Sequence, residues 1–306
     1  MSKLYTAFRL MQEKRGSCMV ALLRNLNFLF PDKLYLQLFY RFRMGYKLDL
    51  KNPKLFTEKI QWLKLYNRNP LYTNLVDKHA VKKWVSEKIG DEYVIPTLGV
   101  WDRGVDIDFD SLPNQFVLKT TNGGGGDVMI CKDKSKFDRV KAIRHLNQSL
   151  KVNIYKILRE WPYKNVQPRI IAEKYMEDEG GALKDFKFFC FDGVCKYCQV
   201  IRDRFTKETI DFYDVEWNHM PFVGLNPVAK NGLNPVAKPK NLEEMISFCE
   251  KLSEGFAFIR VDLYNVDGKI YFGELTFYPA SGFGVLDPDE WNYKLGNMLK
   301  LPLENR

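Results

Sequence analysis

The chain has 306 residues, of which 45% are hydrophobic and 14% aromatic, so it can bury a large packed core. Its 47 lysine and arginine residues outnumber the 38 acidic residues, and the formal net charge of +9 favours anionic partners. The basic residues are spread along the whole chain instead of forming one stripe, which argues against nucleic acid as a partner. Nucleotides, acidic glycans and an anionic membrane surface remain as partners.

The six cysteines do not follow the spacing of a small disulfide scaffold, so a reducing cytosol fits them best. Near the N-terminus, an apolar run over residues 18–23 is interrupted by Arg24, well short of the roughly 18 residues that span a bilayer. We therefore expect a cytoplasmic protein. Basic and apolar residues also alternate in this region, which leaves peripheral association with the inner face of the membrane as an alternative to ordinary helix packing.

Apolar residues at helical spacing predict three helices in the first third of the chain, over residues 32–46, 56–66 and 77–89. Two further helices are predicted over residues 136–158 and 242–252. Short segments rich in β-branched and aromatic residues follow Ile95, and they predict strands within residues 115–121, 127–132, 169–176 and 186–201. This order predicts an α+β fold. We expect a helical N-terminal region (1–90), a small subdomain with a glycine-rich loop (91–176) and a large subdomain with a metal site (177–306).

One internal repeat is present, because the seven residues 224–230 recur unchanged as residues 232–238. Two copies are too few for a solenoid, which needs at least three stacked units. Both copies contain an Asn-Pro pair, which is typical of loops. The repeat is therefore predicted to be a surface loop that was lengthened by duplication and has no dedicated role.

The strongest local signal is an apolar strand that ends in Lys119 and leads into four consecutive glycines, Gly123, Gly124, Gly125 and Gly126. Backbone N–H groups in such a loop can approach phosphate oxygens closely, because no Cβ atom obstructs them, and the lysine adds a positive charge. The loop leads to a second strand and has no Gly-Lys-Ser/Thr ending, so it is neither a P-loop nor a dinucleotide fingerprint. It predicts a phosphate-binding loop, with a flexible hairpin tip as the alternative.

A second signal lies near the C-terminus, where Asp267-Gly268 separates two alternating strands and predicts a hairpin. If the loop consists of residues 267–269, Asp262 pairs with Glu274 and Arg260 with Thr276, all on one face of the sheet. Two carboxylates in this position can bind Mg²⁺, and the arginine can meet a phosphoryl group. A structural Arg-Asp pair is the simpler alternative.

These segments resemble the ATP-grasp enzymes in their order and spacing. The resemblance is carried by Lys119 with its glycine loop, the strand at 170–176, and the two motifs Arg260-Val261-Asp262 and Gly273-Glu274-Leu275-Thr276. More narrowly, residues from about 49 to 288 resemble the TupA-like branch, which is associated with surface polysaccharide and teichuronopeptide gene clusters in bacteria. The resemblance implies an ATP-grasp fold, in which two α+β subdomains grip ATP, behind the helical N-terminal region.

The resemblance also implies roles for individual residues. Lys119 would contact the nucleotide phosphates, Gly123 to Gly126 would fold over them, and Glu173, Lys174 and Tyr175 would lie near the adenine and ribose. Asp262, Glu274 and Thr276 match the metal-binding positions. Thr276 replaces the asparagine of many relatives, which puts a second metal position in doubt. The catalytic contacts would come from Arg260, which steadies the transferring phosphoryl group, and Lys187.

The activity implied is ligation of a carboxylate to an amine through an acylphosphate, with ATP and Mg²⁺ as cofactors, in the assembly of a bacterial surface polysaccharide. Small-molecule or glycan carboxylates and amines would be the substrates, and membrane-bound glycan assembly machinery a peripheral partner. The alternatives are a glycosyltransferase that uses the acidic run at residues 106–110, a sugar kinase with the same ATP site, and a non-catalytic scaffold. The pair Cys195 and Cys198 matches a zinc spacing, but residues three apart on a strand point to opposite faces.

Overall fold

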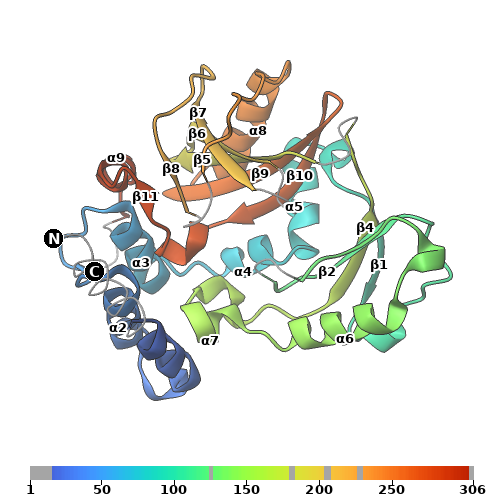
Figure 1. Cartoon of the computed structure of the whole chain (residues 1–306), viewed down its shortest axis with the longest axis horizontal. Coiled ribbons are helices and arrows are strands. Elements are labelled where there is room, and N and C mark those ends of the chain that lie inside the picture. Colours follow the sequence, from blue (N-terminus) through green and yellow to red (C-terminus); the bar gives the residue numbers. More distant parts are fainter. Residues whose placement is uncertain (1–15, 124–126, 179–182, 203–207, 226–229, 303–306) are drawn as a thin grey trace.

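The computed structural model describes residues 16–123, 127–178, 183–202, 208–225 and 230–302. In these residues two antiparallel sheets form the framework, and helices pack around and between them (Figure 1). The larger sheet lies at the top of Figure 1, the smaller sheet at the right and the N-terminal helices at the lower left. Within the described part of the chain, no helix has the length and apolar character that crossing a bilayer requires.

The smaller sheet has four strands in the order β1-β4-β2-β3 and a hydrophobic core of its own. Helix α6 (Arg139–Leu150) packs against β2 through its buried residues Ala142 and Leu146. A short helix, α7 (Ile154–Leu158), follows α6, so the single helix predicted over residues 136–158 is interrupted near Asn153, whose side chain accepts a hydrogen bond from the N–H of Lys156. The strands are β1 (Thr97–Trp101), β2 (Phe116–Thr120), β3 (Met129–Cys131) and β4 (Ile170–Lys174).

The larger sheet has five strands in the order β10-β9-β5-β6-β7 and belongs to the main core. The strand predicted over residues 186–201 is in fact two strands, which turn at Asp192 and Gly193, both with positive φ. Helix α8 (Leu242–Ser253) covers one face of β5, β6 and β9. The strands are β5 (Asp185–Phe191), β6 (Val194–Arg202), β7 (Thr209–Asp214), β9 (Phe258–Val266) and β10 (Lys269–Thr276), and a separate pair is formed by β8 (Val223–Gly224) and β11 (Leu286–Asp287).

The N-terminal helices complete the main core on the side of the larger sheet. Helix α2 contributes four buried side chains, and α3 is buried around most of its circumference, because it packs between α2, α9 and the turn after β10. Two helices were not predicted: α4, which is only six residues long, and α9 at the C-terminal end. The helices are α2 (Asp32–Met44), α3 (Phe56–Tyr66), α4 (Leu71–Val76), α5 (Ala80–Ile89) and α9 (Glu290–Met298), and residues 16–25 are also helical.

Six short 3₁₀ helices connect these elements within the residues that the structure describes. They are η1 (Asn27–Leu29), η2 (Asp91–Tyr93), η3 (Gly104–Asp106), η4 (Lys134–Lys136), η5 (Trp161–Lys164) and η6 (Pro279–Gly282). The predicted boundaries at residues 90 and 176 fall just after α5 and just after β4. The three-part division of the chain remains a prediction.

The second copy of the duplicated segment is a loop with mostly exposed residues, as predicted, but it is anchored to the main core, which was not predicted. Val236 is buried, its N–H donates to the hydroxyl of Tyr213 (2.6 Å) and its carbonyl accepts from the indole of Trp217 (2.9 Å). The first residue of this copy packs as well, because the N–H of Gly232 donates to the buried carboxylate of Asp211 (3.1 Å). The sequence did not show this, since an Asn-Pro pair marks a turn but not what the turn packs against. Residues 226–229 of the first copy lie outside the described residues.

We predict that Val236→Ala lowers the free energy of unfolding by about 2 kcal/mol, because two buried methyl groups are lost and a cavity remains. Leu233, in the same copy, is 99% exposed, so Leu233→Ala should change stability by less than about 0.5 kcal/mol. Urea denaturation of both variants measures the difference. If both variants change the free energy of unfolding by the same small amount, Val236 does not anchor the second copy to the core.

Candidate active site

The hairpin of β9 and β10 places the predicted residues on one face, although by a different route from the one expected. Strand β10 pairs with β9 so that Glu274 lies opposite Asp262 and Thr276 opposite Arg260, as predicted. The loop, however, has two residues, since Lys269 already pairs with Val266. Its central residues Asp267 and Gly268 both have positive φ, as a tight hairpin turn requires. A β-bulge at Gly273 then restores the predicted register.

Asp262 is the centre of the first ion-pair network. Arg260 donates to it twice, from Nε to Oδ1 (2.6 Å) and from Nη2 to Oδ2 (2.7 Å). Lys187, directly opposite Asp262 on β5, also donates to Oδ2. The same Nη2 atom of Arg260 reaches the hydroxyl of Thr276 (2.9 Å) and Oε1 of Glu274 (3.4 Å). One row across β5, β9 and β10 thus carries a cation and two carboxylates, with the arginine beside it.

Glu173 on β4 is the centre of the second network. Its Oε2 atom pairs with Nζ of Lys119 on β2 (2.6 Å), and its Oε1 atom pairs with Nζ of Lys82 on α5 (2.6 Å). Burial raises the pKa of Glu173, but the two ammonium groups lower it by more, so the net shift is downward. Lys82 also donates to the carbonyl of Ile95 (2.7 Å) and to the hydroxyl of Thr97 (2.8 Å). The sequence did not single out Lys82, since it is a polar residue on an ordinary amphipathic helix.

Lys78, in the turn before α5, holds the start of the glycine loop. Its N–H donates to the carbonyl of Thr121 (3.2 Å) and its ammonium group to the carbonyl of Gly123. Asp127 at the far end of the loop accepts from both the N–H (3.1 Å) and the hydroxyl (2.7 Å) of Thr120. A Cβ atom on Gly123 would lie 2.0 Å from this carboxylate, so a larger residue there would displace Asp127 from Thr120. The predicted contacts of Gly124, Gly125 and Gly126 lie outside the described residues.

Electrostatics join the two networks into one site. Burial alone would raise the pKa of Glu274, but the nearby charges of Lys78, Lys187, Arg260 and Lys119 lower it to about 2. These four cations come from both sheets and from the turn before α5. The side chain of Glu274 nevertheless keeps 41% of its exposure, so water and solutes can reach its carboxylate. Glu274 therefore lies where the two halves of the site meet.

A buried lysine from the N-terminal region fixes the turn that follows β10. Lys64 on α3 is fully buried and donates to the carbonyl of Leu158 (3.0 Å) and to the carbonyl and hydroxyl of Ser281 (2.6 and 2.7 Å). Gln61, one turn earlier, donates to the carbonyls of Ser281 (3.0 Å) and Gly282 (2.9 Å). Ala280 and Ser281 have positive φ, which is strained for residues with a Cβ atom. The helical region thus holds a strained turn four residues beyond Thr276.

The other candidate residues lie apart from the two networks. Lys174 is exposed at the end of β4, and the hydroxyl of Tyr175 donates to Glu177 (2.9 Å), so their predicted nucleotide contacts remain predictions. In the acidic run at 106–110, Asp106 pairs with Arg103 (2.6 Å) and Asp110 with Arg139 (3.1 Å). Cys195 and Cys198 are both buried in the main core.

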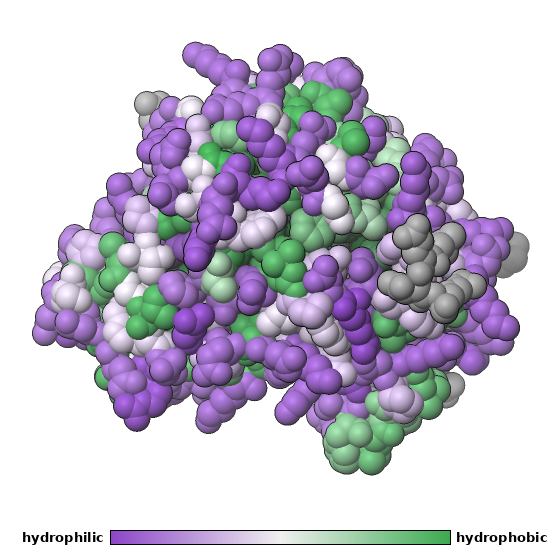
Figure 2. All heavy atoms as spheres, turned by 180° about the vertical axis from the view of Figure 1, so that it is seen from behind, coloured by the Kyte–Doolittle hydropathy of each residue, from purple (hydrophilic) through white to green (hydrophobic). Residues whose placement is uncertain are grey.

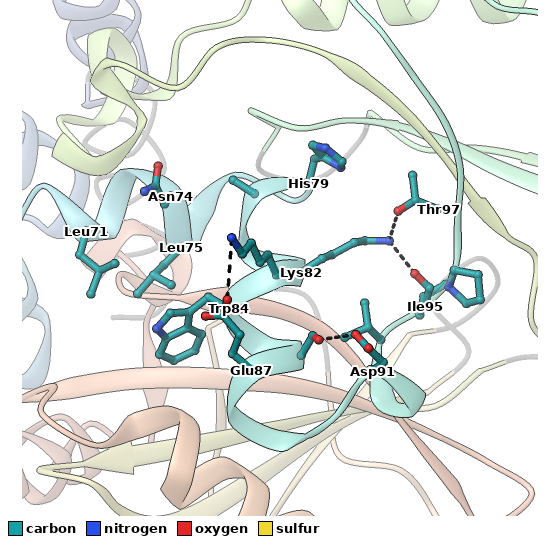
Figure 3. A pocket seen from close by; sticks show the side chains of 15 residues that line it. Leu71, Asn74, Leu75, His79, Lys82, Trp84, Glu87, Asp91, Ile95 and Thr97 are labelled. Carbon is teal, nitrogen blue, oxygen red and sulfur yellow. Dashed lines mark hydrogen bonds and ion pairs between the residues drawn. The ribbon is translucent and has the colours of Figure 1, made fainter.

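A pocket of about 830 Å³ adjoins the second network (Figure 3). Leu71 and Leu75 of α4 and Trp84 of α5 line one side, and the segment from Val94 to Thr97 lines the other. Lys82 lines the pocket as well and points from α5 toward Ile95 and Thr97 (Figure 3). Because Lys82 also pairs with Glu173, the pocket and the site share this side chain.

The site has the charged groups that binding of a nucleoside triphosphate requires. Lys82 and Lys119 pair with Glu173, and Lys78, Lys119, Lys187 and Arg260 all act on the single carboxylate of Glu274. A polyphosphate can bind such a group of cations. The ammonium group of Lys78 contacts the carbonyl of Gly123, so the start of the glycine loop lies beside these cations. The residues therefore fit ATP.

The fit to Mg²⁺ rests mainly on Glu274. Its carboxylate is accessible and stays ionised because its pKa is low. Both oxygens of Asp262 accept bonds from Arg260 or Lys187, so Asp262 can coordinate a metal only when one of these cations releases it. Among the described residues there is no group of three or more His, Cys, Asp or Glu side chains that could hold a metal ion. A metal would thus need phosphate oxygens to complete its coordination.

Two antiparallel sheets, a glycine-rich loop and lysine–carboxylate networks on both sides of one site define an ATP-grasp protein. Residues 58–300 match the model of the TupA-like ATPgrasp family, so the chain belongs to this family. This membership confirms the family and the α+β fold that the sequence motifs predicted, and it assigns the chain to the ATP-grasp enzymes. No curated protein matches the chain.

Two ligases and one synthetase are among the solved structures that the comparison matched to this chain. D-alanine–D-alanine ligase from Bacillus anthracis is 18% identical, with a TM-score of 0.40 and coverage of 78% of this chain and 67% of that chain. The same ligase from Helicobacter pylori is 12% identical (TM-score 0.42; 80% and 69% covered). D-cycloserine synthetase DcsG is 18% identical (TM-score 0.43; 76% and 72% covered). At these identities the likeness says nothing about the substrates of this chain.

We predict that Glu173→Gln lowers the free energy of unfolding by about 3 kcal/mol at pH 7, because Lys82 and Lys119 lose the carboxylate between them. Since its pKa is lowered in the folded state, Glu173 stabilises the protein fully above its ordinary pKa of about 4.3 and loses this effect as the pH falls further. The difference between parent and variant should therefore shrink below about pH 4. Urea denaturation from pH 7 to pH 3 measures it, with Glu177→Gln as an exposed control. A difference that does not change with pH would contradict the shift.

Proposed function

We propose that this protein is an ATP-dependent ligase that joins a carboxylate to an amine through an acylphosphate. The observation that supports the proposal best is the group of cations around Glu274, which suits a triphosphate and a carboxylate substrate together. Lys119 and Lys82, released from Glu173, would hold phosphate oxygens from the side of β2 and α5. Membership of the TupA-like family supports a role in the assembly of a bacterial surface polysaccharide, and this role is part of the proposal.

The chemistry follows from the positions of the charged groups. Arg260 presents a planar guanidinium next to Asp262 and Glu274, where it can stabilise negative charge on a phosphoryl group in transfer. Lys187, which is buried, can move from Asp262 to a phosphate oxygen without leaving the row. Mg²⁺, when bound at Glu274 and Thr276, would neutralise phosphate charge. No nucleophilic side chain is needed, because the substrate carboxylate attacks the γ-phosphorus of ATP and releases ADP, and the amine then attacks the carbonyl carbon of the acylphosphate and releases phosphate.

The direct test is to incubate the protein with Mg-ATP and a panel of amino acids and acidic sugars and to analyse the products by mass spectrometry. We expect ADP and a product whose mass is that of the carboxylate plus the amine minus water, formed only when both are present. ADP with a phosphorylated sugar and no need for an amine would overturn the ligase in favour of a kinase. Hydrolysis of a nucleotide sugar without use of ATP would favour a glycosyltransferase.

Lys119→Ala should weaken ATP binding by about 1.5 to 3 kcal/mol, because a charge-assisted contact to phosphate is lost. Lys136→Ala is the matched control, since Lys136 is an exposed lysine that pairs with Asp133 (3.4 Å) and belongs to neither network. Isothermal titration calorimetry of the two variants gives the affinities, and thermal melts check the fold, because Lys119 also pairs with Glu173. Equal affinities for the parent and Lys119→Ala would remove Lys119 from the site.

Glu274→Gln should lower turnover by at least about 10²-fold, since the variant lacks the charge that metal and phosphate require but keeps the side-chain volume. Asp262→Asn should have an effect at least as large, but it also leaves Lys187 and Arg260 without their buried partner and should be less stable. Glu274→Gln is thus the cleaner test of chemistry, and Glu290→Gln on α9 is its exposed control. Parental turnover in both site variants would show that the paired carboxylates are not catalytic.

A further inference from the structure

The N-terminal end of the described chain carries an exposed apolar surface. It is formed by the helical residues 16–25, by η1 and by the start of α2. Phe28 is 75% exposed and Leu29 is 60% exposed, although both are large and apolar. Figure 2 shows a hydrophobic protrusion at its lower right, which corresponds to the N-terminal helices at the lower left of Figure 1. We call this surface the apolar tip; its residues are Met19, Leu22, Phe28, Leu29 and Leu34.

The apolar tip is additional to the face with which these helices join the core. Helix α2 already buries Tyr35, Leu36, Phe39 and Tyr40, and Leu23 is buried in the same cluster. The exposed side chains of the tip are therefore not the ones through which these helices pack on the core. Exposure of several neighbouring apolar side chains on one surface is unusual for a protein that remains free in water, and it marks a surface that binds something.

Charge indicates what the tip binds. Residues 16–48 contain five basic residues and one acidic residue, Asp32. Asp32 is already paired with Arg68 (2.6 Å) and Arg159 (3.1 Å). The surroundings of the tip are therefore positive. The five basic side chains, all exposed, are Arg24, Lys33, Arg41, Arg43 and Lys47.

We propose that the apolar tip and these basic side chains dock the protein on an anionic membrane surface. Phe28, Leu29 and Leu22 would enter the boundary between headgroups and acyl chains, and Arg24 and Lys33 would pair with lipid phosphates. An anionic membrane surface attracts a patch that combines apolar and basic side chains and whose one acidic residue, Asp32, is already paired. A protein partner of neutral or positive charge would not be favoured by such a patch. The contact is peripheral and reversible.

The test uses the full chain and two kinds of vesicle, phosphatidylcholine alone and phosphatidylcholine mixed with phosphatidylglycerol. We expect co-sedimentation with the mixed vesicles, little with the neutral ones, and release by high salt, because salt screens the lipid charges. The double variant Phe28→Asp/Leu29→Asp should lower the partition coefficient by at least about tenfold. Leu233→Asp/Val140→Asp is the matched control, since it places the same two charges on other highly exposed apolar residues and should bind like the parent.

The outcomes separate this proposal from the alternatives. Failure of the parent to bind mixed vesicles, or equal binding by the parent and the double variant, overturns it. Dimers of the parent that the double variant abolishes, without vesicle binding, would assign the tip to a second copy of the chain and also overturn it. ATP affinity measured on the same variants should be unchanged, because none of these residues belongs to the candidate active site, so a failure here leaves the proposed ligase untouched.

Discussion

The candidate site brings five cationic side chains together, and the surrounding structure has to offset their mutual repulsion. Two like charges 4 Å apart repel by about 4 kcal/mol at the effective dielectric of a protein surface. Glu173 offsets this between Lys82 and Lys119, and Asp262 offsets it between Lys187 and Arg260. Each carboxylate belongs to a strand, so the position of each network depends on the register of its sheet. Glu274 lies among cations from both networks, which explains its low pKa and makes it the point where substrate charge would be balanced.

The register of the β9–β10 hairpin shows how far sequence reasoning reaches. The Asp-Gly turn and the pairing of Asp262 with Glu274 were both predicted. The turn was predicted to have three residues, and it has two. The predicted pairing of Asp262 with Glu274 is nevertheless correct. The bulge at Gly273 shifts the register by one residue and so compensates for the turn that is one residue shorter than predicted. A strand pattern fixes which residues can share a face, but a bulge depends on packing against neighbouring strands, which a single sequence does not show.

The parts of the site that the sequence did not reveal come from helices. Lys119, Lys187 and Glu173 lie on strands, where motif and alternation make them visible. Lys82 and Lys78 lie at α5 and in the turn before it, and Lys64 lies on α3; in sequence each is one lysine among many. A lysine on a helix is usually a solvated residue, so its role appears only when the tertiary structure shows what its ammonium group reaches.

The N-terminal helices connect the two proposals physically. Helix α2, which carries part of the apolar tip, packs against α3, and Lys64 of α3 donates to the strained turn just after β10. The path from the tip to this turn runs through side chains that are almost entirely buried, so little relative motion is available between them. A membrane contact at the tip would therefore fix the orientation of the whole active site relative to the lipid surface. The helical region would then serve two purposes with one set of packed helices: it holds the turn beside the site and it sets the direction from which a membrane-bound substrate arrives.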